Sequence, residues 1–312
     1  MDSLFLIVPY YNYNNSKVSK RNLDELFRSE FDERIKIVFV EGLLPGQKPT
    51  LDYEDVVFKH YTFPVVHKLW IQHNLINLAL RSLPSWEYAI WLDRDIRFRD
   101  VDWADKVLNK FKSGIDLFQP FSECVFLGED NLPSVDEASV FFNQEEDGDK
   151  NFKIISYCKS LKENIPSDKK TVYRHPGQTW CISRKFFERV GGIFDVGILG
   201  ANDLIMCSFL NPNFIKSTKL NFYSRLFEKA YFSKYLKFSN VDFDYLDGLI
   251  FHKWHGDTKK RLYYSRYEIL IEDSDFVLDL DICYSKEGVI MLTDRGLRIL
   301  PKIEKYFSSR MD

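Results

Sequence analysis

Two aspartates separated by one residue are the strongest chemical signal in the sequence. Asp93 and Asp95 follow a continuous apolar run, residues 88–92, which predicts a buried strand. In an extended segment the two side chains point to the same side of the chain. Because two like charges repel each other at short distance, a cation between or beside them stabilises the pair. Carboxylate oxygens suit Mg²⁺ or Mn²⁺, which keep open positions for diphosphate oxygens, so the pair predicts a metal–diphosphate site.

Such a site suits the transfer of a sugar from a nucleotide-sugar donor. The bond between the anomeric carbon and a diphosphate oxygen breaks, and a divalent ion acts as a Lewis acid on the negative charge of the leaving group. The anomeric carbon becomes similar to an oxocarbenium ion. The acceptor hydroxyl must lose a proton in order to attack, and a carboxylate can take it. We therefore expect a carboxylate base in addition to the metal-binding pair.

The elements that must position these acids alternate between strand and helix signals. Short apolar or β-rich runs predict strands at residues 4–8, 35–40, 53–58, 88–92 and 115–118. Helical spacing predicts helices at residues 20–30, at 67–83 before Pro84, and from Asp102 onwards. This alternation predicts an α/β fold with a mostly parallel sheet, which binds ligands at the carboxyl ends of its strands. The polar residues expected at those ends are Tyr10, Tyr11, Asn12, Glu41, Asp93 and Asp95.

The composition excludes several classes of protein. A net charge of −3 over 312 residues gives no general attraction to nucleic acid. The five cysteines are odd in number and contain no CxxC pair, which argues against a disulfide framework or a structural zinc site. No apolar run approaches the ~18 residues of a membrane span. We therefore expect a cytoplasmic protein without a transmembrane segment and without a nucleic-acid partner.

The chain is expected to consist of a large catalytic part and a short extension. Residues 1–261 are assigned to the catalytic domain, which an acidic insertion interrupts at about 128–150. Within it, Ser183 is expected to cap a helix that ends at Gly191, and a further helix is predicted at 202–210. Residues 262–312 are assigned to a C-terminal helical extension.

Five segments, taken in order, resemble the GT-A fold glycosyltransferases of the family 2-like kind that occur in bacteria, phages and giant viruses. These segments are residues 4–12, 73–98, 175–206, 251–270 and 302–310. Together they cover most of the chain, and their order is more specific than any one of them. The resemblance implies a GT-A, Rossmann-like nucleotide-sugar-binding fold with a mixed, mostly parallel sheet. It also implies Mn²⁺ or Mg²⁺ as the cofactor.

The resemblance also implies roles for individual residues. Asp203 is expected to be the catalytic base. The metal ligands are expected to be Asp93, Asp95, His252 and His255. The donor nucleotide and its diphosphate are expected to contact Pro9, Tyr10, Tyr11, Glu41, Asp93, Arg94, Lys259 and Arg261. The sugar or the acceptor is expected to contact Gly177, Trp180 and Asn202.

Each of these roles has a plainer alternative in the residues themselves. Asp203 opens an apolar helix and can serve as its cap, alone or in addition to acting as base. Trp180 can be a core aromatic residue, and Glu41 a surface acid at a strand end. The sequence also departs from the family pattern, because Arg94 stands where a small residue is commoner and Asn202 stands where many relatives carry an acid. If Asp203 is the base the reaction inverts the anomeric centre, and if it is not a retaining mechanism stays open.

The expected function is transfer of a sugar from a UDP- or GDP-linked donor to a hydroxyl of a glycan, polysaccharide or glycoprotein. One alternative is a sugar nucleotidyltransferase, which would favour a glycine-rich phosphate loop near the N-terminus. The first predicted strand ends in Pro9, Tyr10, Tyr11 and Asn12, without glycine, which counts against it. The other alternative is a nucleotide- or carbohydrate-binding protein without turnover.

Overall fold

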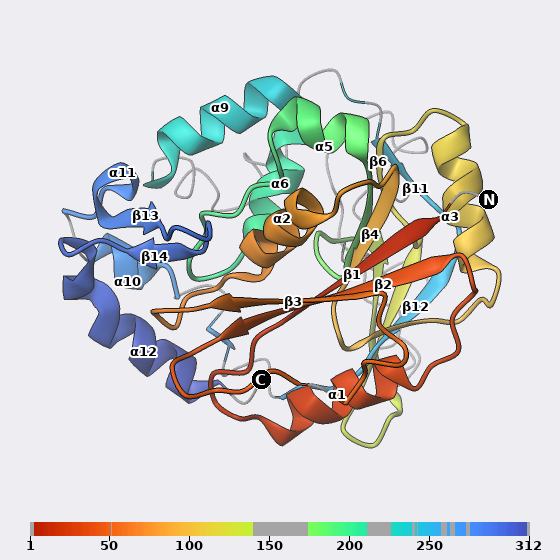
Figure 1. Ribbon diagram of the computed structural model, residues 1–312, viewed down its shortest axis with the longest axis horizontal. Coiled ribbons are helices and arrows are strands. Elements are labelled where there is room, and N and C mark those ends of the chain that lie inside the picture. The colour runs from red at the N-terminus through yellow and green to blue at the C-terminus, as the bar shows by residue number, and fades with distance from the viewer. Residues whose placement is uncertain are drawn as a thin grey trace, which may run out of the picture.

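A seven-stranded sheet forms the centre of the molecule (Figure 1). The computed structural model describes residues 3–50, 52–139, 174–210, 226–238, 241, 243–256, 261–262, 266–272 and 275–310. The strand order in the sheet is β11-β6-β10-β4-β1-β2-β3. The strands are β1 (Leu4–Tyr10), β2 (Ile35–Leu43), β3 (Lys59–Pro64), β4 (Tyr88–Leu92), β6 (Leu117–Gln119), β10 (Thr179–Ser183) and β11 (Phe243–Tyr245).

This sheet is mixed and mostly parallel, as the sequence predicts. Strands β3, β2, β1 and β4 pair in parallel, and β11 pairs in parallel with β6. Only β10 runs antiparallel to both of its neighbours, β4 and β6. The α/β class is therefore confirmed, and the carboxyl ends of β1, β2 and β4 meet at one edge, where a ligand site is expected.

Both faces of the sheet are buried because its central strands are apolar on both sides. In β1, Phe5 and Ile7 enter one core, whereas Leu4, Leu6 and Val8 enter the other. Helices α1 (Lys17–Phe27) and α3 (Trp103–Lys112) cover the second core. The first core is covered by α2 (Gln72–Ser82), α5 (Arg184–Val190), α6 (Asn202–Leu210) and α9 (Glu228–Phe238).

A second sheet positions the candidate site. Its order is β5-β12-β7-β8-β9, with strands β5 (Ile96–Phe98), β7 (Glu123–Leu127), β8 (Pro133–Ser139), β9 (Arg174–His175) and β12 (Leu249–His252). Strand β5 begins one residue after Asp95 and pairs antiparallel with β12, so that Ile96 lies opposite His252. This register brings two segments that are far apart in the sequence to the end of β4. Residues 140–150 of the predicted acidic insertion lie outside the described residues.

Some element boundaries differ from the sequence-based prediction. The strand predicted at 53–58 is wrong, because residues 52–56, which include three acids, form a turn, and the strand follows at Lys59–Pro64. The helix predicted from residue 67 starts at Gln72, because the Trp70 amide donates instead to the Ile198 carbonyl at 2.8 Å. The predicted cap is confirmed, because Ser183 Oγ accepts from Phe186 N and Gly191 is left-handed with φ 67°.

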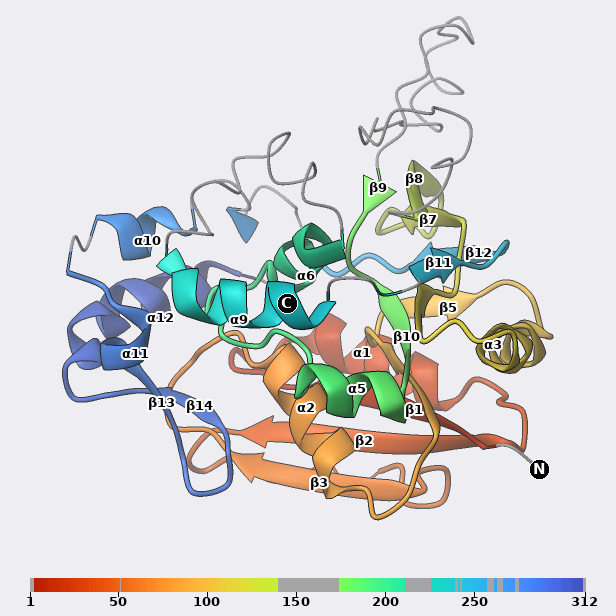
Figure 2. The ribbon, with the colours of Figure 1, turned by 90° about the horizontal axis from the view of Figure 1, so that it is seen from above.

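The C-terminal part contains more than helices. It holds α10 (Glu268–Ile271), α11 (Leu278–Asp281), β13 (Ile282–Tyr284), β14 (Ile290–Leu292), a 3₁₀ turn (Gly296–Ile299) and α12 (Leu300–Ser309). Strands β13 and β14 pair as a hairpin through a turn that contains Gly288, at φ 86°. Figures 1 and 2 show these elements gathered at the end of the molecule opposite α3. Among the described residues, no helix combines the length and apolar character needed to cross a bilayer.

Candidate functional site

A buried cluster of possible metal ligands lies where the link between β4 and β5 meets the end of β12. Asp95, His252 and His255 each offer one ligand atom, and these atoms lie within 4.8 Å of one another. The Asp95 carboxylate is 3.9 Å from His252 Nε2 and 3.3 Å from His255 Nδ1. The backbone holds the same register, because Lys253 N donates to the Asp95 carbonyl at 2.8 Å. Three predicted metal ligands are therefore brought together at the sheet edge.

The Asp95 carboxylate fits a cation better than it fits its protein surroundings. Asp95 is 2% exposed, yet its Oδ1 atom has no hydrogen-bond partner among the described residues. A buried carboxylate oxygen without a donor is costly, and a divalent ion would satisfy it. One carboxylate and two imidazoles also form a donor set that divalent transition metals accept. The residues present therefore fit a divalent metal.

The charges around the cluster favour the metal-binding protonation states. Burial acts to raise the pKa of Asp95, but His255, His252, Arg94 and Arg261 outweigh it and hold this pKa below its ordinary value. Burial lowers the pKa of His252 well below its ordinary value, so its imidazole is neutral at pH 7. Arg94 and Arg261, which stay charged, add to the effect that keeps Asp95 ionised. An ionised carboxylate and a neutral imidazole are the forms that bind metal.

The pKa of Asp93 is shifted in the opposite direction to that of Asp95. Burial, followed by the charge of Asp95, raises the pKa of Asp93 well above its ordinary value, and Asp203 adds to the effect. The Gln72 side-chain amide donates to Asp93 Oδ1, and Asp93 N donates to the Gln178 carbonyl at 3.1 Å. Asp93 is not one of the three clustered ligands, so its role as a second carboxylate ligand stays a prediction.

The predicted base lies against Gly177. Asp203 is in the first turn of α6. A Cβ on Gly177 would lie 2.5 Å from Asp203 Oδ2 and 2.9 Å from His175 Cε1, so a side chain there would displace the Asp203 carboxylate. Gly177 precedes Gln178, whose carbonyl accepts from Asp93 N, so the predicted base lies close to the metal-binding link, and its charge acts on Asp93. The contact of Gly177 with the sugar or the acceptor stays a prediction.

Two residues predicted to touch sugar or acceptor are corrected by the structure. Trp180 has no exposed surface; its ring stacks near Trp91 and its Nε1 donates to the Pro176 carbonyl at 2.8 Å. It is a core residue, and no face of it is open to a sugar. Asn202 is 1% exposed, and its amide both accepts from Gly197 N at 2.7 Å and donates to the Gly197 carbonyl at 3.2 Å. It closes the loop that leads to Asp203, so its contribution is to backbone geometry.

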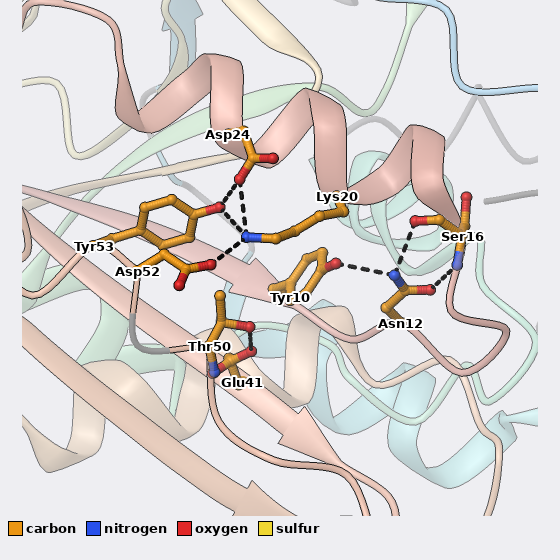
Figure 3. Close-up of polar contacts among 9 residues, drawn as sticks. All are labelled: Tyr10, Asn12, Ser16, Lys20, Asp24, Glu41, Thr50, Asp52 and Tyr53. Atoms are coloured by element: carbon orange, nitrogen blue, oxygen red, sulfur yellow. Dashed lines mark hydrogen bonds and ion pairs between the residues drawn. The ribbon is translucent and has the colours of Figure 1, made fainter.

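Tyr10 and Glu41, two of the predicted nucleotide-binding residues, lie near the carboxyl ends of β1 and β2, where polar contacts are dense (Figure 3). Tyr10 is buried, and its hydroxyl accepts from Asn12 Nδ2 at 3.0 Å. Glu41 is 2% exposed and accepts from Thr50 N at 2.9 Å, from Thr50 Oγ1 at 2.8 Å and from His60 at 2.8 Å. Both oxygens of Glu41 are therefore already bonded within the protein.

The other described residues that are predicted to contact the nucleotide or its diphosphate lie in different surroundings. Pro9 is buried within β1, and the half-buried Tyr11 packs edge-on against Trp70, with ring centres 6.1 Å apart. The Arg94 guanidinium lies 6.0 Å from the centre of the Tyr10 ring, between the nucleotide-binding and metal-binding residues. Arg261 is 6% exposed, and its charge acts on Asp95. Lys259 lies outside the described residues.

Sequence reasoning missed Gln72, whose side-chain amide donates to Asp93, and did not single out Gln178, whose backbone carbonyl accepts from Asp93 N. Gln72 starts α2 and Gln178 follows Gly177, so neither shows a local pattern of the kind that marks an acid pair. Gln72 could have been predicted from its position, because it begins a helix of an α/β unit and the strand that follows this helix ends directly before Asp93. Gln178 lies within a segment that the resemblance already assigns to the sugar or acceptor.

No protein-family model matches this sequence, and no curated protein sequence matches it. Among solved structures, S. aureus TarS is similar at 12% identity and a TM-score of 0.42, over 88% of this chain and 66% of that chain. Glucosyl-3-phosphoglycerate synthase from Mycobacterium tuberculosis, in complex with Mn²⁺, UDP and phosphoglyceric acid, is 12% identical with a TM-score of 0.41, over 88% and 78% of the two chains. The mannosyltransferase PcManGT from Pyrobaculum calidifontis, in complex with GDP-Man and Mn²⁺, is 14% identical with a TM-score of 0.35, over 66% and 50%.

This chain thus spans 66% of the matched TarS chain and half of the PcManGT chain. At this level of identity and TM-score, the likeness assigns no role to any residue of this chain. The roles of individual residues therefore have to come from the geometry of this chain.

Proposed function

We propose that the protein is a metal-dependent glycosyltransferase of the GT-A, family 2-like kind. It transfers a sugar from a UDP- or GDP-linked donor to a hydroxyl of a glycan, polysaccharide or glycoprotein. The observation that carries this proposal is the buried Asp95–His252–His255 cluster, in which one carboxylate oxygen has no hydrogen-bond partner among the described residues. A third acid, Asp203, faces the same site from α6.

The metal-binding residues are assigned by their position and protonation. Asp95, His252 and His255 hold Mn²⁺ or Mg²⁺, with Asp93 as a further oxygen ligand. When bound, the ion supplies Lewis-acid stabilisation of the leaving diphosphate. Arg261 and Arg94, whose charges act on Asp95, contribute positive charge to the diphosphate.

Asp203 takes the proton of the attacking acceptor hydroxyl. A carboxylate within reach of that hydroxyl contributes about 10²- to 10⁴-fold to the rate in enzymes that use general bases. Because a single base and a single leaving group take part in one displacement, this assignment predicts inversion at the anomeric carbon. Pro9, Tyr10, Tyr11 and Glu41 lie on the nucleotide side, where Glu41 acts mainly through the loop that it holds.

The test is a panel of UDP- and GDP-sugars incubated with Mn²⁺ and scored for slow hydrolysis. We expect one donor to be hydrolysed by the wild-type protein, and Asp95→Asn to lower this rate by about 10³-fold or more because it removes the charge that binds the metal. A chelator should reproduce the loss. Asp281→Asn is the matched control, because Asp281 is also buried, at 0% exposed, and pairs with Arg295 and Arg298.

The control shows whether a lower rate of hydrolysis comes from loss of the metal or from loss of folded protein. Asp281→Asn should destabilise the C-terminal part and leave hydrolysis per folded molecule unchanged. Undiminished hydrolysis by a folded Asp95→Asn protein would remove the metal from the mechanism. Failure of every donor with the wild-type protein would contradict the proposal as a whole.

A further inference from the structure

A strained turn lies between the metal-binding link and the predicted base. Gln178 adopts a left-handed backbone with φ 80°, which is uncommon for a residue other than glycine. Its carbonyl accepts from Asp93 N at 3.1 Å, and its neighbour Gly177 lies against the Asp203 carboxylate. Strain of this kind persists only where surrounding contacts fix the conformation, and it concentrates at functional sites.

Several contacts do fix the turn. Gln119 Nε2 donates to the carbonyls of His175 and Gly177, each at 3.1 Å. The Thr179 hydroxyl donates to the Trp91 carbonyl at 2.8 Å, directly after Gln178. The turn is thus held from both sides by core elements. The backbone of Gln178 is therefore kept in one conformation before any substrate arrives.

The side chain of Gln178 is buried with one end bonded and the other open. Gln178 is 3% exposed, and its Nε2 lies 3.3 Å from His175 Nδ1. Since that ring nitrogen already accepts from Gly177 N at 3.0 Å, it carries a lone pair, so the amide must present its NH₂ group to it. This fixes the orientation of the amide and leaves Oε1 as the other end. Oε1 has no hydrogen-bond partner among the described residues.

From this arrangement we infer that Gln178 binds a hydroxyl group of the sugar being transferred. An amide oxygen only accepts, so its ligand must be a donor, and a sugar hydroxyl is a donor. The inference rests on the proposed function, in which the transferred sugar lies between the metal-bound diphosphate and Asp203. Gln178 contacts Asp93 on one side and adjoins Asp203 through Gly177 on the other, so it occupies that interval. A rotation of the side chain on binding brings Oε1 to the hydroxyl.

The experiment compares the affinity for a nucleotide with the affinity for its sugar form. UDP, GDP, UDP-glucose, UDP-N-acetylglucosamine and GDP-mannose are titrated with Mn²⁺ into wild-type protein and Gln178→Met by calorimetry. Methionine has a similar length and keeps the left-handed backbone, but offers no such acceptor. We expect the ratio of Kd for the nucleotide to Kd for its best-bound sugar form to fall about five- to tenfold, with Kd for the nucleotide unchanged.

A stability measurement separates a ligand-binding role from a structural one. Gln178→Met removes a buried oxygen without a partner and also the long bond from Nε2 to His175, so the two effects offset each other and its Tm without ligand should stay close to that of the wild type. Gln178→Gly, which also relieves the left-handed strain, should lose the sugar-dependent affinity to the same extent.

Three results would overturn the inference. One is an unchanged affinity ratio in Gln178→Met, and another is equal affinity of the wild type for each nucleotide and its sugar forms. Both leave the proposed metal–nucleotide site intact. The third is failure of the wild-type protein to bind any nucleotide with Mn²⁺, which also contradicts the proposed function.

Discussion

Buried polar groups are treated differently on the two sides of the candidate site. On the proposed nucleotide side, at the ends of β1 and β2, Glu41 uses both oxygens to hold Thr50 and His60. On the proposed sugar side, around the β4–β5 link, Asp95 Oδ1 and Gln178 Oε1 are buried and have no hydrogen-bond partner among the described residues. A group that is already bonded maintains the fold. A buried acceptor without a donor lowers the stability of the free protein. This loss is expected at a binding site, where a ligand supplies the missing donor or cation.

This contrast predicts how each side responds to substitution. On the sugar side, replacing a group should reduce binding or catalysis strongly and should cost little stability. On the nucleotide side, the same kind of change should cost stability and alter ligand affinity only slightly. The comparison fails if the two sides respond alike.

The largest effect is expected at the predicted base. Asp203→Asn keeps the shape of the side chain and removes its ability to take a proton, so transfer to simple glycoside acceptors should fall about 10³-fold. Donor binding, measured by calorimetry with Mn²⁺, should be retained because Asp203 is not among the clustered ligands. Transfer at the wild-type rate would move the base to another residue and leave the inverting mechanism without its support.

Part of this site can be predicted from the sequence because it is locally encoded. The Asp93–Asp95 pair follows an apolar strand, and His252 and His255 lie three residues apart before a glycine. Pairing of β5 with β12 then unites the two signals in one cluster. The helix at 202–210 and the Ser183 cap were predictable for the same reason, because each depends on its immediate neighbours.

The rest depends on contacts between distant segments. The bond from Gln72 to Asp93 and the bond from Asp93 N to Gln178 exist only once α2, β4 and β10 are assembled. Trp180 shows the same limit, since a tryptophan that stacks on a sugar and one that packs in a core look alike in a sequence. Burial, which only the fold decides, separates the two.

A smaller effect is expected at the imidazole ligands. His255→Gln should weaken Mn²⁺ binding about 10- to 100-fold, because glutamine offers a poorer ligand from a different position. His67→Gln is the matched control: His67 is also 9% exposed, but its Nδ1 accepts from Leu292 N at 3.1 Å, outside the cluster. Titration of Mn²⁺ by calorimetry measures both variants. Equal losses in the two would show that burial of a histidine, and not metal ligation, sets the affinity.

The smallest effect on ligand binding is expected at Glu41. Glu41→Gln keeps one acceptor oxygen but places an NH₂ group against Thr50 or His60, so the free energy of unfolding should fall by about 1–3 kcal/mol. The affinity for UDP or GDP with Mn²⁺ should change less than about threefold, because both oxygens of Glu41 are already hydrogen-bonded within the protein. Denaturant unfolding and calorimetry measure the two quantities on the same sample. If the affinity instead fell tenfold with stability unchanged, Glu41 would contact the nucleotide directly, and bonded groups on this side could no longer be assigned to the fold alone.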